Sequence, residues 1–140
     1  MNGVADINSR SLDKWLDYIQ EQHDKEIDMG LDRMFEMVER LDLNPITPNV
    51  VTVAGTNGKG TVCHLLEATY RHAGYKTGLF TSPHLISFSE RFRIQGKPVS
   101  DNKLVAFFAQ VSTLLNLYKL SYFELSTVIA FTYLKMNISI

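Results

Sequence analysis

The chain has 140 residues, 45% of them apolar and 21% charged, which is the usage of an ordinary soluble globular domain with a hydrophobic core. Lys and Arg total 14 against 15 for Asp and Glu, and this net charge of −1 excludes a broad basic surface for nucleic acid or an anionic membrane. The first ten residues lack a secretory signal pattern, no apolar run is long enough to cross a bilayer, and a lone cysteine excludes an intrachain disulfide. These features favour a cytoplasmic protein.

Two amphipathic helices are predicted in residues 1–48, which form a helical lead-in. Ser11 is a candidate cap for the first helix, and Asp28 and Gly30 mark the start of the second. Two prolines in residues 44–48 then break the helical pattern and indicate a connector. The apolar residues that recur at helical spacing are Leu12, Trp15, Leu16 and Ile19, followed by Leu31, Met34, Phe35, Val38 and Leu41.

A strand, a glycine-rich loop, a helix and a second strand are predicted in that order in residues 49–81. The first strand, residues 49–54, carries a β-branched run typical of buried parallel strands. The helix begins at Lys59 and ends before Gly74, a candidate C-cap, and residues 76–81 form the second strand. Together they predict one right-handed βαβ crossover. The expected fold class is therefore α/β, with a P-loop-type parallel sheet and flanking helices.

Residues 82–140 are predicted to form a long surface loop followed by two helices. A strand-like arm covers residues 87–95, a turn follows at Gly96, and helical periodicity covers residues 101–119 and 123–135. Ser100 is a candidate cap of the first of these helices, and Ser121 and Tyr122 mark the break between them. The chain ends where a βα pattern calls for another parallel strand, so we expect it to be the front part of something longer.

The glycine-rich loop, residues 55–61, has the residue types of a phosphate site. Gly55 and Gly58 permit positive φ angles, which turn backbone N–H groups inward at the start of a helix. Lys59 adds a positive point charge, and the hydroxyl of Thr61 is a donor that Mg²⁺ accepts. The pattern predicts binding of a phosphorylated ligand.

The loop departs from the strict phosphate-loop pattern of nucleotide-binding proteins. Val53 stands where the first glycine of that pattern belongs, and Gly60 separates Lys59 from the hydroxyl residue. Its place between a predicted strand and a predicted helix supports a phosphate site. The alternative is a glycine-rich turn that binds no ligand.

Four ordered motifs resemble the N-terminal part of folylpolyglutamate synthase and dihydrofolate synthase, which belong to the Mur ligase superfamily. The glycine loop at residues 53–61 reads Val-Ala-Gly-Thr-Asn-Gly-Lys-Gly-Thr, and residues 81–85 read Thr-Ser-Pro-His-Leu, with Glu90 and Arg91 following. Residues 27–33 resemble the family's segment ahead of the loop, and residues 121–124 resemble its pteroate-contacting segment. The bifunctional bacterial enzymes are the most similar in these motifs.

The resemblance implies an ATP-dependent amide ligase that joins L-glutamate to dihydropteroate and/or to folates through an acyl phosphate, with Mg²⁺ as cofactor. It implies small-molecule substrates and a monomer in the full-length form. Carried over residue by residue, it assigns ATP phosphates to Asn57, Gly58, Lys59 and Gly60, with Lys59 also catalytic. It makes Thr61 and Ser82 ligands of Mg²⁺. The residues that it places in the lining of the pteroate pocket are Ile27, Asp28, Met29, Ser121, Tyr122, Phe123 and Glu124.

Several of these residues also have simpler interpretations. Without the resemblance, Asp28 is a helix cap and Phe123 packs in the core. His84 either contacts substrate or metal or makes a structural hydrogen bond. Glu90 and Arg91 order the loop after Ser82, reach the folate, or form an exposed charged arm.

The family's later segments are not present in the 140 residues. In the family these segments bring an acidic Mg²⁺ ligand, a metal-binding histidine, a functional lysine and a C-terminal domain. We therefore expect an incomplete ATP-binding domain, from a fragment or a truncated reading frame, with the ligase function incomplete in this chain. The alternative is a nucleotide-binding fragment or remnant without catalysis.

Overall fold

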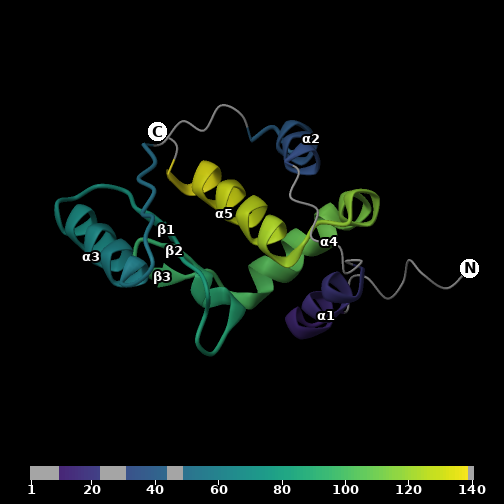
Figure 1. The fold of residues 1–140 in the computed structure, drawn as a ribbon, viewed down its shortest axis with the longest axis horizontal. Helices are drawn as coiled ribbons and strands as arrows, with labels where there is room; N and C mark the ends of the chain where they lie inside the picture. Colours follow the sequence, from purple (N-terminus) through teal and green to yellow (C-terminus); the bar gives the residue numbers. More distant parts are fainter. Residues whose placement is uncertain (1–9, 23–30, 44–48, 139–140) are drawn as a thin grey trace, which may run out of the picture. The chain divides into compact units, whose positions relative to one another are not determined.

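The structure is a computed structural model that describes residues 10–22, 31–43 and 49–138 (Figure 1). In chain order its elements are α1 (Leu12–Gln22), α2 (Asp32–Arg40), α3 (Lys59–His72), β1 (Gly78–Phe80), the 3-10 helix η2 (Phe88–Arg91), β2 (Phe92–Ile94), β3 (Lys97–Pro98), α4 (Asp101–Tyr118) and α5 (Tyr122–Ile138). None of the helices in these residues has both the length and the apolar character needed to cross a membrane.

The chain divides into two compact units. One, here called the helical unit, comprises Met1–Asn44 and Ser100–Ile129, and so contains α1, α2, α4 and the start of α5. The other, the sheet unit, comprises Pro45–Val99 and Ala130–Ile140, and contains α3, the three strands, η2 and the end of α5.

The core of the helical unit lies where α1 packs against α4. Trp15 is fully buried, and its ring centroid lies 5.8 Å from that of Phe108 on α4. Ile19, one turn further along α1, is also buried. Lys14 donates its backbone N–H to Ser11 Oγ over 3.4 Å, so the cap predicted for this helix is present. The helical spacing of the first segment thus predicted both the helix and its buried face.

The second helix forms as predicted, but a different residue is buried. Met37 is the fully buried residue of α2, while Leu31 and Phe35 are 62% and 63% exposed. Apolar spacing shows that a helix is amphipathic, whereas the covered face depends on the element that docks against it. Here that element is α4.

The sheet unit is built on a three-stranded antiparallel sheet of order β1-β2-β3. Gly78 of β1 pairs with Ile94 of β2, and Ile94 pairs in turn with Lys97 of β3. Gln95 and Gly96 join β2 to β3 with φ angles of 51° and 76°. Two consecutive positive φ angles match the right-handed twist of a hairpin, which explains the glycine at the predicted turn.

The predicted parallel βαβ unit is wrong for the residues that the structure describes. Residues 49–54 have no strand structure, and Val50 and Val51 are 56% and 63% exposed. The strand predicted in residues 76–81 does form as β1, but it pairs antiparallel with β2. A β-branched run becomes a buried parallel strand only when neighbouring strands complete its hydrogen bonds and other elements cover its faces. Here the hairpin strand β2 forms the backbone hydrogen bonds of β1 instead.

The remaining helices agree with the predicted ones within a few residues. The last two were expected in residues 101–119 and 123–135, and α4 and α5 cover Asp101–Tyr118 and Tyr122–Ile138. Gly74 follows α3 with φ 89°, as expected for a C-cap glycine. Ser100 is the N-cap residue of α4, although its side chain makes no capping hydrogen bond.

Candidate functional site

The glycine loop leads directly into the first turn of α3. Gly58 is the N-cap residue of this helix and has a left-handed φ of 75°, and Gly55 has a φ of 154°. Val62 donates its backbone N–H to the Gly58 carbonyl over 3.0 Å, which begins the helical hydrogen-bond pattern. No side chain caps this terminus. Because the first N–H groups of a helix have no partner within the helix, they are available to an anion.

Lys59, the first residue of α3, folds back over the loop. Its Nζ atom donates to the Gly55 carbonyl over 2.6 Å and reaches the Thr56 carbonyl at 3.5 Å. Lys59 and the glycines around it are exposed. A positive charge and a helix N-terminus are therefore presented together on an accessible loop.

Two hydroxyl residues belong to the same unit as this loop. Thr61 lies in the first turn of α3 and Ser82 follows β1, and both are exposed. Their hydroxyl oxygens are hard donors of the kind that Mg²⁺ prefers, so they fit as part of its coordination, with phosphate and water oxygens as the other ligands. Within residues 10–22, 31–43 and 49–138, no group of three or more His, Cys, Asp or Glu residues forms a metal site.

The loop after Ser82 is ordered by Glu90. The Glu90 carboxylate accepts backbone N–H groups from Ser87 at 2.9 Å and from Leu85 and Ile86 at 3.2 Å each. The Ser87 N–H, followed by that of Leu85, lowers the pKa of Glu90 below its ordinary value of 4.5. Of the three interpretations of Glu90, the structure supports the ordering of this loop.

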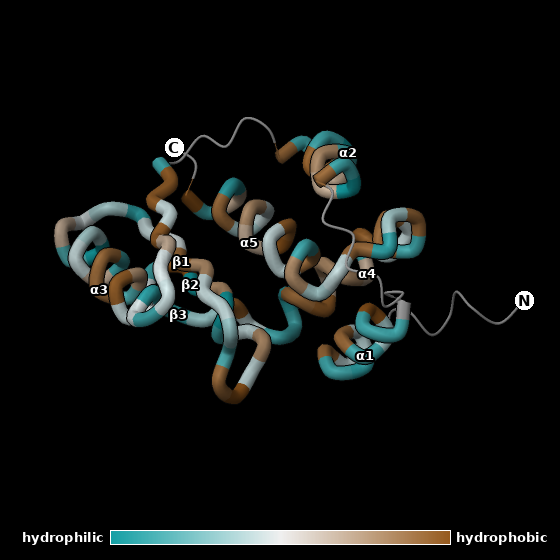
Figure 2. The backbone as a smooth tube through the Cα atoms, viewed as in Figure 1, coloured by the Kyte–Doolittle hydropathy of each residue, from teal (hydrophilic) through white to brown (hydrophobic). Residues whose placement is uncertain are grey.

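A second contact joins the two ends of this loop. Arg91 Nε donates to His84 Nδ1 over 2.8 Å, so His84 makes a structural hydrogen bond. Between these contacts, Leu85 and Ile86 are 93% and 91% exposed, and Figure 2 shows the apolar tip of the loop between β1 and η2.

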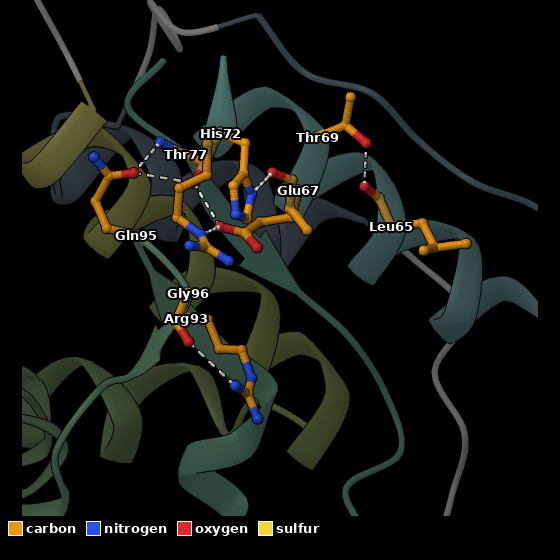
Figure 3. A network of polar contacts seen from close by, with 10 residues as sticks. Leu65, Glu67, Thr69, His72, Thr77, Arg93, Gln95 and Gly96 are labelled. Atoms are coloured by element: carbon orange, nitrogen blue, oxygen red, sulfur yellow. Dashed lines mark hydrogen bonds and ion pairs between the residues drawn. The ribbon is translucent and has the colours of Figure 1, made fainter. Parts of the chain in front are cut away.

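A buried polar network supports α3 from the sheet (Figure 3). Thr77 Oγ1 donates to a Glu67 carboxylate oxygen over 2.6 Å, and Arg71 Nε donates to the same oxygen over 3.0 Å. On the other side, Gln95 Oε1 accepts the Thr77 backbone N–H over 2.9 Å. Glu67 and Thr77 are each only 8% exposed. Sequence reasoning missed this network, although Glu67 and Arg71 have the i, i+4 spacing of a helical ion pair.

The segment expected to line a pteroate pocket is the start of α5 in the helical unit. Ser121 and Glu124 form a capping box: Glu124 donates its N–H to Ser121 Oγ over 3.2 Å, and Ser121 donates its N–H to Glu124 Oε2 over 2.7 Å. Phe123 is 60% exposed and Tyr122 is half-buried. The core interpretation of Phe123 is therefore wrong. Ile27, Asp28 and Met29, the other residues expected in this pocket, lie outside the described residues.

Comparison with known proteins finds similarity to folate enzymes, although no protein-family model matches the chain. The chain is 43% identical over 119 residues to the dihydrofolate synthase/folylpolyglutamate synthase of Escherichia coli strain K12, which covers 85% of the chain and 28% of that protein. Its structure is similar to that of E. coli FolC in complex with DHPP and ADP, with a TM-score of 0.84, 40% identity, and coverage of 92% of this chain and 31% of that one. A bifunctional folylpolyglutamate synthase/dihydrofolate synthase with Mn, AMPPNP and L-glutamate bound gives a TM-score of 0.82 and 41% identity, and covers 91% and 31%.

These comparisons confirm the class that the motifs indicated: the chain is a homologue of the folate ligases. In particular, its sequence and structure are similar to those of one part of the dihydrofolate synthase/folylpolyglutamate synthases. The chain spans about 30% of the length of the relatives named above.

Proposed function

We propose that the chain provides the nucleotide-phosphate site and part of the pteroate site of an ATP-dependent ligase that joins L-glutamate to dihydropteroate and/or to folates. The observation that carries this proposal is the start of α3, where the left-handed Gly58 presents free helix N–H groups beside the Lys59 ammonium. The E. coli relative was solved with DHPP and ADP, and another relative with Mn, AMPPNP and L-glutamate. These ligands support ATP and a divalent ion as cofactors.

In this proposal the loop holds the ATP phosphates through its backbone N–H groups and through the positive charge of Lys59. Asn57, Gly58 and Gly60 contribute backbone N–H groups near the helix N-terminus, where a negative charge is stabilised. Lys59 leaves its carbonyl partners in the loop and approaches the transferred phosphoryl group. Its role is to neutralise charge as the phosphoryl group leaves ADP.

Thr61 and Ser82 would hold Mg²⁺ through their hydroxyl oxygens. When bound, the ion neutralises phosphate charge and helps to orient the nucleotide. Both residues are exposed. Thr61 lies in the first turn of α3 and Ser82 follows β1, so their positions depend on these two elements.

The pteroate site is proposed to include Ser121, Tyr122, Phe123 and Glu124, together with Ile27, Asp28 and Met29. The exposed Phe123 ring supports this assignment, because a large apolar ring at the surface is suited to a flat aromatic ligand.

The proposed reaction has two steps. A carboxylate oxygen of the pteroate attacks the γ-phosphorus of ATP and expels ADP, which leaves an acyl phosphate. The amine of L-glutamate then attacks the acyl carbon, loses a proton and expels phosphate, which forms the amide. Charge neutralisation by the loop supports the first step.

Titration of the chain with AMPPNP and Mg²⁺ by calorimetry tests the nucleotide site. Lys59→Ala is expected to weaken binding roughly 10- to 100-fold, since a charge-assisted hydrogen bond contributes about 1.5–3 kcal/mol. Lys76→Ala is the matched control, because Lys76 is an exposed lysine of the same unit outside the loop. Equal affinity of the Lys59→Ala variant and the unmodified chain would contradict the assignment.

A second assay separates ligase activity from nucleotide binding alone. Phosphate release is measured with ATP, dihydropteroate and L-glutamate present, and again with each one omitted. Release that requires all three compounds supports the ligase, whereas binding without release favours the non-catalytic alternative.

A further inference from the structure

Arg33 and Glu124 form an ion pair within the helical unit. Arg33 lies in the first turn of α2, and its Nη2 atom donates to both oxygens of the Glu124 carboxylate, at 3.2 and 3.4 Å. The two side chains are only 25% and 13% exposed. Because water has little access to this ion pair, the attraction between the two charges is screened weakly. The loss of one partner leaves the other charge poorly solvated.

The Glu124 carboxylate has a second structural contact, because it accepts the Ser121 backbone N–H over 2.7 Å. It therefore receives three contacts from two groups of the protein, and these use most of its acceptor positions. Such a carboxylate is suited to holding the helix start in place, and less suited to binding a ligand directly.

The exposed Phe123 ring is held between these two anchored residues. Ser121 begins the capping box and Glu124 completes it, so the position of the intervening turn depends on both. Arg33 fixes this turn to α2. The aromatic surface assigned to the pteroate is thereby attached to a second helix.

We propose that Arg33 and Glu124 are positioning residues for the pteroate: their ion pair sets the orientation of the Tyr122 and Phe123 turn. This inference rests on the proposed function. It adds Arg33 to the residues on which folate binding depends, and it gives the Glu124 side chain a positioning role.

The test measures the affinity of the chain for 7,8-dihydropteroate and, separately, for AMPPNP with Mg²⁺. Arg33→Met is expected to weaken dihydropteroate binding about tenfold, because it leaves the poorly solvated Glu124 charge without its partner and releases the turn that carries Phe123. Nucleotide affinity should not change. Adding Glu124→Gln to Arg33→Met removes the uncompensated charge and keeps the capping acceptor, so the double variant should bind dihydropteroate more tightly than Arg33→Met alone.

Two further variants separate positioning from a general effect on folding. Arg40→Met removes another arginine of α2, whose guanidinium lies 5.8 Å from the Tyr118 ring centroid, and it should leave dihydropteroate affinity within about twofold. Phe123→Leu should weaken binding by itself. Its effect should not add to that of Arg33→Met, because both act through one ring. Circular dichroism confirms that each variant is folded.

The outcomes distinguish this inference from the proposed function. If Arg33→Met leaves dihydropteroate affinity unchanged while Phe123→Leu weakens it, the positioning role is overturned and the pteroate site stands. Additive effects of these two substitutions also overturn the positioning role. If the unmodified chain binds no dihydropteroate, the proposed pteroate site fails and the inference fails with it.

Discussion

Replacing Thr77 with valine removes one hydroxyl group from a buried network and keeps the shape of the side chain. Thr77 Oγ1 lies 2.6 Å from the Glu67 carboxylate and 3.1 Å from Gln95 Oε1. The Glu67 side chain is 7% exposed, so water replaces the lost donor poorly. Arg71 still donates to this carboxylate, which limits the loss to one hydrogen bond.

A hydrogen bond to a charged group contributes about 1.5–3 kcal/mol, and we expect Thr77→Val to cost about 2 kcal/mol. That loss corresponds to a roughly 30-fold increase in the equilibrium constant for local opening. Thr69→Val is the matched control. Thr69 is exposed, and its hydroxyl donates to the Leu65 carbonyl, one turn earlier in the same helix, over 2.8 Å (Figure 3). Its replacement should change stability by less than about 0.5 kcal/mol.

Amide hydrogen exchange, resolved by peptide, is the suitable assay, because the chain has two units and a single melting temperature would combine them. Thr77→Val should lower protection in α3 and β1 and leave α1 and α4 unchanged. Equal protection in the two threonine variants would refute the claim that this network stabilises the sheet unit.

Two further predictions concern the same unit. Gly78→Ala should destabilise β1 by about 1 kcal/mol, measured by hydrogen exchange, because the added Cβ would collide with the side-chain methyl groups of Leu134 and Ile138. The usual gain in stability from replacing a strand glycine would contradict this crowding. Glu90→Gln should remove a pH dependence from the loop. Since the folded pKa of Glu90 is lowered, its stabilisation is present above the unfolded value near 4.5 and is lost as the pH falls through the folded pKa. Exchange of the Ser87 amide, followed by NMR from pH 6 to pH 3, should show this loss in the unmodified chain, and equal profiles in both proteins would contradict it.

The features that the sequence predicted are those determined by neighbouring residues. Gly58 adopts the positive φ expected before a helix, and Gly74 adopts the one expected after it. The capping box of Ser121 and Glu124 also depends on only four consecutive residues, although it was not among the predicted caps. Local steric and hydrogen-bonding preferences are enough to specify such features.

The features that the sequence did not predict depend on residues that are distant in the chain. Arg33 and Glu124 are 91 positions apart, and nothing in the spacing around either residue indicates the other. Likewise, the β-branched run of residues 49–54 indicated a strand, but the partner of β1 is the hairpin strand β2. Pairing of this kind is decided by the competition among all available strands, which a local pattern does not describe.

The difference between local and distant effects also explains why the glycine loop keeps its conformation without the predicted parallel strand. Gly58 supplies the helix start, and Lys59 bonds to carbonyls of the loop itself, so neither depends on pairing by residues 49–54. The position of α3 is set from its C-terminal half, where Glu67 contacts Thr77 beside β1. The local loop sequence therefore provides the chemistry of the proposed phosphate site, and the buried network positions the helix that carries it. On this argument, substitution of Thr77 should affect nucleotide affinity less than substitution of Lys59, because it alters the support of the helix and leaves the binding groups in place.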